Sequence, residues 1–258
     1  MVSSSSSRLG SGSPRRGIPY VDVHCHAVEY SAEDWEKIEK LGILVVAVSE
    51  DLQSSHATIE LAKQMENVTP CVGIHPWCVG EASLDDLKVI EKMISREEAR
   101  CIGEVGLDKK FVPETIERQR VFFEEFLRIA REYDVALNLH TAGAWREVYE
   151  ELLRNDIRKA VFHWYTGPLD LMESIVENGY LISINVAAKI QEKHREVIKR
   201  VPLSSMVTES DGPYKYRGLR LSSAMLPELV KMIAEIKGVS ENVVLEKAYT
   251  NHVRLLWG

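Results

Sequence analysis

Residues 21–26 read VDVHCH, a strand-like run of apolar residues interrupted by one aspartate and two histidines. Because successive side chains of a strand point to opposite faces, Asp22, His24 and His26 are expected on one face and the intervening apolar residues on the other. The two histidines would then lie roughly 7 Å apart, within reach of a single ion between them. A pair of hydrogen-bonded, buried histidines would give the same pattern, so the rest of the chain must distinguish a metal site from a structural pair.

Strand-like runs recur along the chain from residue 18 onward. β-branched residues cluster near 20–24, 43–48, 69–74, 100–105, 135–140, 159–164, 180–185 and 206–210, and a helix-like stretch follows each run. Eight strand–helix units in about 240 residues are typical of a single (β/α)8 barrel of the TIM type. A doubly wound open sheet is the alternative. The barrel predicts that the chemistry lies at the carboxyl ends of the strands, where the βα loops begin.

The helix-like stretches carry start and stop signals. Pairs of Ser and Asp with the spacing of a capping box precede two of them, at Ser31–Asp34 and Ser83–Asp86. Residues that end or begin helices stand at further boundaries: Gly42, Pro113, Pro168 and Ser240. No linker or shift in composition divides the pattern, so residues 18–258 are predicted to form one domain.

Composition and charge limit the classes of function. The 258 residues are 45% hydrophobic and carry a formal charge of −7, so the chain can bury a large core. The acidic balance argues against indiscriminate binding of nucleic acid through net charge, although a local basic patch or a metal site could still hold phosphates. No stretch approaches about 18 consecutive apolar residues, which predicts a soluble, cytoplasmic protein without membrane contact. The pattern does not indicate an obligate protein partner.

The N-terminus and the cysteines bear on the cellular compartment. Residues 1–17 are rich in Ser and Gly and lack the apolar segment of a secretory signal, so they are predicted to be a disordered tail. The cysteines show no C-x-x-C spacing, and at least two of them fall within strand-like runs. They are predicted to be buried free thiols in a reducing compartment rather than disulfides: Cys25, Cys71, Cys78 and Cys101.

Polar side chains gather where the predicted strands end. Five of the eight histidines lie there with three acidic residues: His24, His26, His75, His140, His163, Glu104, Glu209 and Asp211. The remaining histidines fall in helical stretches and are expected to be solvated or to cap helices: His56, His194 and His252.

A metal site explains this distribution of polar residues. Four imidazoles and two carboxylates would converge on one mouth of the barrel: His24, His26, His140, His163, Glu104 and Asp211. These are N and O ligands that Zn²⁺, Mn²⁺ or Mg²⁺ accept. Six ligands are too many for one tetrahedral zinc and suit two ions that share a carboxylate. The sequence therefore predicts two divalent ions per chain.

With these residues in place, the chain resembles the TatD family of metal-dependent nucleases over residues 20–257. The resemblance rests on six motifs in order: D-x-H-x-H at 22–26, GIHPW at 73–77, IGEVGLD at 102–108, NLH at 138–140, FHWYTG at 162–167 and TESDGPY at 208–214. It implies that one ion is held by His24, His26, Glu104 and Asp211, and that Glu104 bridges to a second ion held also by His140 and His163. It also implies hydrolysis of phosphodiesters, usually in DNA and often from an end.

The sequence departs from the family pattern at positions that bear on the substrate. Where an arginine often stands two positions after the strand-five histidine, this chain has Ala142, and Arg146 could serve instead. Lys109-Lys110 replace a tyrosine, Trp164-Tyr165 replace a smaller residue and Phe, and Gly212 replaces a frequent serine. None of these positions is a proposed metal ligand.

The mechanism expected from this site is attack by an activated water. Two ions a few ångströms apart would lower the pKa of a shared water toward about 7 and take up charge that develops on the phosphate. Asp211 is expected to orient or deprotonate that water, with Glu104 as the bridging carboxylate. His75 is expected to contact a phosphate oxygen, or else to stack on Pro76. Glu209 and Asp22 are candidates for orienting ligand histidines, and Asp108 could hydrogen-bond a loop or take part in the chemistry.

The substrate-binding residues are expected on the same rim. Lys215, Arg217 and Arg220 follow strand eight and would contact a DNA backbone, with Lys109 and Lys110 nearby. Aromatic residues could stack on bases: Trp77, Trp164 and Tyr165. Two other functions remain open. One is hydrolysis of an acyl ester, lactone or amide such as an aminoacyl-tRNA by the same metals, and the other is a non-catalytic, metal-stabilised binding module.

Overall fold

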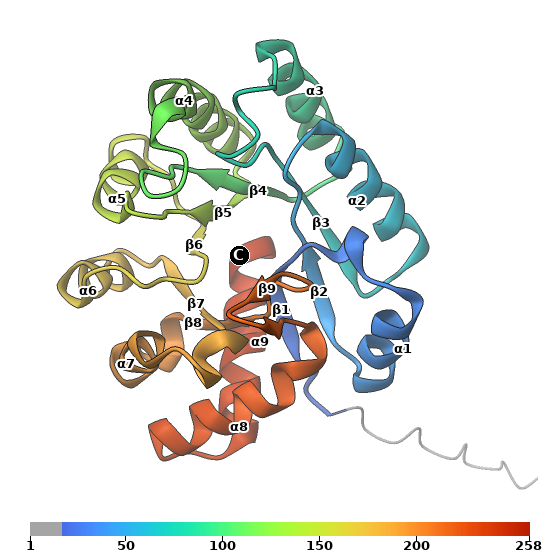
Figure 1. Cartoon of the computed structure of the whole chain (residues 1–258), viewed down its shortest axis with the longest axis vertical. Helices are drawn as coiled ribbons and strands as arrows, with labels where there is room; N and C mark the ends of the chain where they lie inside the picture. Colours follow the sequence, from blue (N-terminus) through green and yellow to red (C-terminus); the bar gives the residue numbers. More distant parts are fainter. Residues whose placement is uncertain (1–16) are drawn as a thin grey trace, which may run out of the picture.

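The computed structural model describes residues 17–258, which form a barrel of eight parallel strands. Each strand pairs with the next along the chain, whereas the strand order of a doubly wound sheet reverses partway. The predicted (β/α)8 barrel is therefore confirmed (Figure 1). The strands are β1 (Val21–Cys25), β2 (Leu44–Ala47), β3 (Val68–Val72), β4 (Cys101–Gly106), β5 (Ala136–His140), β6 (Ala160–Phe162), β7 (Leu181–Asn185) and β8 (Met206–Glu209). The predicted tail over residues 1–17 lies outside the described residues, except for Gly17.

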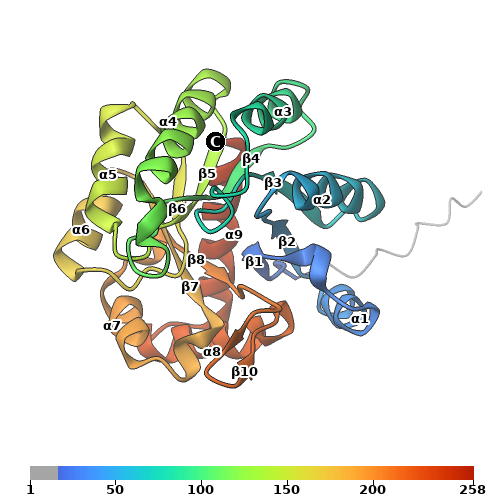
Figure 2. The ribbon, with the colours of Figure 1, turned by 45° about the horizontal axis from the view of Figure 1, so that its top comes forward.

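Helices surround the strands, and α9 passes behind them in both views (Figures 1 and 2). The helices are α1 (Ala32–Leu41), α2 (Leu52–Gln64), α3 (Leu84–Ser95), α4 (Ile116–Tyr133), α5 (Trp145–Arg154), α6 (Leu169–Glu177), α7 (Glu192–Arg200), α8 (Leu226–Lys237) and α9 (Glu241–Trp257). Both predicted capping boxes form, Ser31–Asp34 and Ser83–Asp86, and Gly42 ends α1 at a φ of 64°. Ser240 precedes α9 without a side-chain capping bond. Within residues 17–258, every helix is too short or too polar to cross a membrane.

Side-chain bonds and single backbone bonds, rather than a regular ladder, close the barrel between β8 and β1. The two strands are in contact, but the described residues contain no strand ladder between them. Instead, the Thr208 hydroxyl donates to the β1 backbone, and Asp22 accepts the backbone N–H of Ser210 at 2.9 Å. The N–H of Asp211 then donates to the carbonyl of His24 at 2.9 Å. These bonds join the ends of β8 and β1, where several predicted ligands lie.

The first strand does not keep the regular alternation predicted for it. Its register against β2 shifts between Asp22 and Cys25. As a result, Val21 and Val23 pack inside the barrel, while Cys25 belongs to the core between strands and helices. The prediction that the apolar residues of this strand share one face is wrong, because an irregularity in register changes the side to which the following residues point.

Apolar side chains fill the end of the barrel opposite the predicted ligands, and we call this cluster the barrel floor. Many of its members come from the first residues of strands, and two come from α9: Val21, Val23, Val46, Val48, Cys71, Cys101, Ala136, Val161, Leu181, Val207, Leu255 and Leu256. Helix α9 contacts β1 and β8. Packed layers of branched side chains of this kind stabilise TIM-type barrels.

The prediction of four free thiols is wrong for two of the cysteines. Cys71 of β3 and Cys101 of β4 form a disulfide. The two residues are direct partners in the parallel register of these neighbouring strands, with their Cα atoms 4.4 Å apart. Sequence spacing does not reveal such cross-strand register. Among the described residues, Cys25 and Cys78 remain free thiols.

Two of the three helical histidines are buried, contrary to prediction. His194 is fully buried in α7, where its Nε2 accepts the backbone N–H of Asn185 at 2.8 Å and its Nδ1 lies 3.1 Å from the carbonyl of Tyr165. His252 is buried in α9 with its ring against Trp257. Only His56 is exposed as expected. Both buried rings face the body of the barrel, because their helices pack against it.

Candidate metal centre

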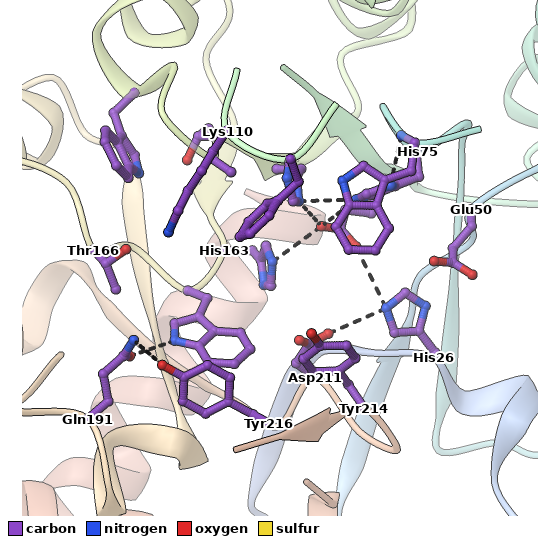
Figure 3. A pocket seen from close by; sticks show the side chains of 18 residues that line it. His26, Glu50, His75, Lys110, His163, Thr166, Gln191, Asp211, Tyr214 and Tyr216 are labelled. Carbon is purple, nitrogen blue, oxygen red and sulfur yellow. Dashed lines mark hydrogen bonds and ion pairs between the residues drawn. The ribbon is translucent and has the colours of Figure 1, made fainter. Parts of the chain in front are cut away.

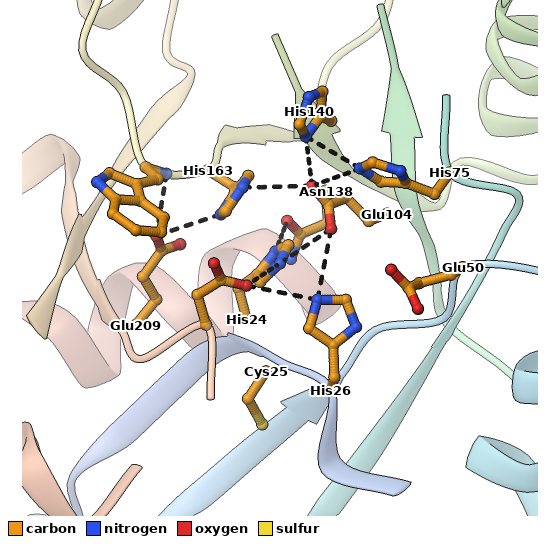
Figure 4. A network of polar contacts seen from close by, with 12 residues as sticks. His24, Cys25, His26, Glu50, His75, Glu104, Asn138, His140, His163 and Glu209 are labelled. Carbon is orange, nitrogen blue, oxygen red and sulfur yellow. Dashed lines mark hydrogen bonds and ion pairs between the residues drawn. The ribbon is translucent and has the colours of Figure 1, made fainter. Parts of the chain in front are cut away.

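The six predicted ligands lie together at the mouth of the barrel (Figures 3 and 4). They come from the ends of five strands, as the barrel requires: His24 in β1 and His26 directly after it, Glu104 from β4, His140 from β5, His163 after β6 and Asp211 after β8. Two sets of three have ligand atoms within 4.8 Å of one another: His24, His26 and Glu104, and His24, His163 and Asp211. The cluster is therefore compact enough to hold cations.

Glu104 stands at the centre of the cluster, and its two oxygens face different histidines. Oε2 lies 3.3 Å from Nε2 of His24 and 3.7 Å from Nε2 of His26. Oε1 lies 2.7 Å from Nδ1 of His140 and 3.2 Å from Nε2 of His163. Asp211 adds a second carboxylate to the first group only, with Oδ1 at 3.4 Å from both β1 histidines. One carboxylate thus spans two groups of nitrogen ligands.

The orientation of His24 tests whether a cation fits. Its Nδ1 lies 2.8 Å from Oδ1 of Asn138, whose amide nitrogen donates to the Val23 carbonyl at 2.7 Å. That second bond fixes the amide, so Nδ1 of His24 carries the proton and Nε2 presents a lone pair. Nε2 is buried, has no hydrogen-bond partner among residues 17–258, and faces carboxylate oxygens of Glu104 and Asp211. A lone pair that faces two carboxylates is repelled unless a proton or a metal cation lies between them, so the residues fit a bound metal.

Two other histidines are oriented in the same way. Nε2 of His140 lies 3.0 Å from the Asp108 carboxylate, and Nδ1 of His163 lies 3.2 Å from Glu209. A ring nitrogen that donates to an outer carboxylate leaves the other nitrogen free to bind a metal. In both rings the other nitrogen faces Oε1 of Glu104. The orienting role considered for Glu209 from sequence fits its contact with His163. Asp108 also accepts the backbone N–H groups of Lys110 and Phe111 at 2.8 Å, which is the loop contact considered for it.

The pKa shifts in the cluster also indicate that its carboxylates favour positive charge beside them. Burial favours the neutral ring of His24, but the carboxylates of Glu104 and Asp211 outweigh it and hold its pKa well above the ordinary value. Burial likewise favours the neutral acid of Glu104, yet the surrounding histidine rings together hold its pKa well below the usual range. The pKa of His140 rises to about 9 for the same reason, despite burial, beside Asp108 and Glu104. Divalent cations would supply this charge in place of protons.

Asp22 links the ends of β1 and β8. Its side chain is fully buried, and Oδ1 accepts the backbone N–H groups of Ser210 and His24. Burial raises the pKa of Asp22 to about 6. The residue therefore holds the β8 end, which carries Asp211, against the β1 end, which carries His24.

His75 lies inside the cluster as a proton donor. Its Nδ1 accepts the backbone N–H of Trp77 at 3.1 Å, so the ring proton belongs on Nε2. Burial lowers the pKa of His75 to about 4, which keeps the ring neutral. Nε2 lies 3.3 Å from Glu104 and 3.1 Å from His140. An N–H donor at this point suits the predicted contact with a phosphate oxygen, which stays a prediction.

The loop predicted to bind the DNA backbone forms a hairpin of β9 (Lys215–Tyr216) and β10 (Leu219–Arg220). Arg217 and Gly218 at its tip have positive φ values of 48° and 86°, as in a type I′ turn. Lys215 and Arg217 are exposed. Arg220 instead donates two hydrogen bonds of 2.8 Å to the Asp34 carboxylate of α1. Its predicted contact with substrate stays a prediction and would have to share the guanidinium with Asp34.

Some of the other rim residues line the cavity, and others pair with neighbouring carboxylates. Trp77, Trp164 and Lys110 line the cavity at the mouth. Lys109 pairs with Glu147, and the exposed Arg146 lies 3.9 Å from Asp170.

Tyr165 does not line the cavity. It is fully buried, packs against Phe162, and donates its hydroxyl to the carbonyl of Pro168 at 2.6 Å. The prediction that Tyr165 stacks on a base is wrong, because its ring forms part of the core between the strands and helices.

Sequence reasoning missed two residues of the site. Asn138 fixes the ring of His24, and its position two residues before His140 on β5 was a usable signal, because both share one face of the strand. Glu50 follows β2 and has a carboxylate oxygen within 4.8 Å of ligand atoms of His26 and Glu29. No motif marks Glu50, and only the folded barrel brings it to the mouth (Figure 4).

Comparisons with known proteins identify the family of this chain. The family model described as TatD related DNase matches residues 21–257. An uncharacterised metal-dependent hydrolase of Methanocaldococcus jannaschii is 29% identical over 248 residues, 92% of this chain and 96% of the relative. Human deoxyribonuclease TATDN3 is 28% identical over 265 residues, 93% of this chain and 95% of the relative. The crystal structure of YjjV, a TatD homologue from Escherichia coli K12, shares the fold with a TM-score of 0.85 at 22% identity, over 93% of this chain and 98% of that one. The chain therefore belongs to the TatD-related family of metal-dependent hydrolases.

Proposed function

We propose that this protein hydrolyses phosphodiester bonds of DNA with two divalent cations. His24, His26, Glu104 and Asp211 would hold one cation, and Glu104, His140 and His163 the other. The observation that carries the proposal is the position of the Glu104 carboxylate between two groups of histidines. Its Oε2 faces His24 and His26, and its Oε1 faces His140 and His163. A bridging carboxylate of this kind is what a pair of closely spaced ions requires.

The side chains of the cluster have separate roles in this reaction. The cations, when bound, would polarise the phosphate and activate a water molecule. Asp211 would orient that water and accept its proton. His75 donates Nε2–H to a non-bridging phosphate oxygen, since its Nδ1 is committed to the Trp77 backbone. Asn138, Asp108 and Glu209 keep the ligand rings turned toward Glu104.

DNA is proposed as the substrate for two reasons. The hairpin of β9 and β10 follows Asp211 directly and presents the exposed cations Lys215 and Arg217 beside the mouth. Cationic side chains that contact phosphates can hold a DNA backbone on a protein whose net charge is −7. In addition, a relative aligned over 93% of this chain bears the name deoxyribonuclease.

A panel of substrates tests this proposal. Protein reconstituted with Zn²⁺, Mn²⁺ or Mg²⁺ is given single-stranded DNA, RNA and an aminoacyl-tRNA, with Glu104→Gln as the matched inactive control. We expect metal-dependent cleavage of DNA that the control lacks. Release of the amino acid from the aminoacyl-tRNA with intact DNA would instead identify an acyl-ester hydrolase, and metal binding without turnover of any substrate would identify a binding module.

A further inference from the structure

The cavity at the mouth extends beyond the metal ligands. It has a volume of about 320 Å³, within the range of small-molecule sites. One side carries the cluster, with His26, Asp211 and Glu50, and the other carries Lys110, Thr166 and Gln191 (Figure 3). The proposed cleavage of a phosphodiester uses only the first side. The second side has room for a further part of the substrate.

Aromatic rings form the wall of this second side. The indole of Trp164 donates Nε1–H to Oε1 of Gln191 at 2.9 Å, and Nε2 of Gln191 donates to the Tyr216 hydroxyl at 3.1 Å. The rings of Trp164 and Tyr216 meet edge to face, with centroids 5.0 Å apart. Loops after β6 and β7 and the hairpin of β9 and β10 thus hold one another, and the indole is fixed before any ligand arrives.

The backbone of Trp164 is held in an unfavourable conformation. Its φ is 40°, in the left-handed region that bulky residues rarely adopt. Its N–H lies 3.0 Å from Glu209 and 3.1 Å from the Ser183 hydroxyl, both potential acceptors. Glu209 also accepts a hydrogen bond from Nδ1 of His163 at 3.2 Å. Strain of this kind clusters at ligand-binding sites. Here the Glu209 carboxylate contacts both the ring of His163, a proposed metal ligand, and the backbone of Trp164, so it fixes the position of the indole relative to that ligand.

We propose that Trp164, with Gln191 and Tyr216, forms a subsite for one unpaired nucleobase next to the scissile phosphate. The inference rests on the proposed phosphodiesterase function and adds the part of the substrate that the metals do not recognise. An aromatic wall binds any base through its face, and Gln191 and Thr166 offer polar groups at its edge. Lys110 lines the same side and can meet a neighbouring phosphate. A base that is stacked here cannot stay in a duplex, so the enzyme acts on a frayed end or a single strand.

Binding of a product tests the subsite without catalysis. Calorimetry on the metal-reconstituted protein compares deoxyadenosine 5′-monophosphate with deoxyribose 5-phosphate, which lacks the base. We expect the nucleotide to bind about 5- to 150-fold more tightly, the range that one base stacked on an aromatic side chain contributes. Trp164→Ala should lower this ratio at least about fivefold, and Trp164→Phe should keep part of it. Trp257→Ala, at the far end of α9, is the matched control and should keep the full ratio.

Cleavage gives the second readout. A dinucleotide is compared with its analogue that carries an abasic sugar in place of one nucleoside, and the ratio of kcat/KM values should fall in Trp164→Ala but not in Trp257→Ala. Equal binding of the two phosphates and equal cleavage of the two dinucleotides would overturn the subsite while leaving the nuclease intact. Absence of cleavage for every phosphodiester would overturn the proposed function, and the binding ratio would still decide whether the wall accepts a base.

Discussion

The two ends of the barrel are built from opposite kinds of buried side chain. At the mouth, four histidines and two carboxylates lie within a few ångströms of one another and are almost as buried as the core. At the floor, valines, leucines and a disulfide fill the same cross-section with apolar groups. Buried polar groups that lack partners cost free energy, whereas buried apolar groups stabilise. The mouth therefore holds the polar groups that the proposed chemistry needs, and the floor contributes apolar burial that stabilises the fold.

The largest effect should come from the centre of the mouth. Glu104→Gln keeps the shape of the side chain but removes the charge that two cations would share, so hydrolysis should fall by about 10³-fold or more, a loss at least as large as that for a key electrostatic group. The metal-free variant should still fold, as circular dichroism would show, because the apolar layers of the barrel interior are unchanged. If turnover persists with metals still bound, the bridging carboxylate lies elsewhere.

Variants that lack a single metal ligand should lose part of the metal bound at the mouth. His24→Ala removes a ring that faces Oε2 of Glu104, and His140→Ala a ring that faces Oε1. We expect each variant to lose at least one of two divalent ions per chain by elemental analysis after reconstitution. Asn138→Ala, which leaves every proposed ligand present, should weaken metal affinity by about 10- to 100-fold through loss of the orienting bond to His24. Full metal content in all three would contradict the proposed ligand set.

A floor variant should show the reverse pattern. Leu256 of α9 is 5% exposed and packs in the floor, so Leu256→Ala should lower the free energy of unfolding by about 2–4 kcal/mol. Metal content and kcat of the folded enzyme should not change. Loss of metal in parallel with stability would show that the two ends are coupled rather than independent.

The sequence predicted the mouth better than its surroundings, for a physical reason. A parallel barrel brings the carboxyl ends of all strands to one rim, so a polar residue at each strand end is enough to predict a cluster. What the sequence missed depends on pairing between separate elements. The Cys71–Cys101 bond needs the β3–β4 register, and the burial of His194 and Tyr165 needs the packing of helices on the barrel. The pairing of Arg220 with Asp34 joins residues 186 positions apart.

The Arg220–Asp34 ion pair allows a test of the smallest expected effect, which concerns DNA binding at the rim of the mouth. Lys215 and Arg217 are exposed, whereas Arg220 is bound by Asp34, whose side chain is 7% exposed. Each phosphate contact contributes about 0.7–0.9 to the slope of log K against log salt concentration. Lys215→Ala combined with Arg217→Ala should therefore reduce the slope of log KM for DNA against log salt concentration by the contribution of up to about two phosphate contacts. KM at low salt should be higher.

Arg220→Ala serves as the comparison, because its charge is already paired. It should change the salt slope little and instead lower the free energy of unfolding by up to about 1 kcal/mol, since its guanidinium is half exposed and the pair is partly screened. Hydrolysis of a small chromogenic phosphodiester, which does not extend to the hairpin, should stay the same in both variants. If Arg220→Ala flattens the salt dependence as much as the double variant does, the Asp34 pair opens when DNA binds and the original prediction for Arg220 stands. If all variants lose activity equally on DNA and on the small substrate, the hairpin supports the metal centre and the DNA backbone lies elsewhere.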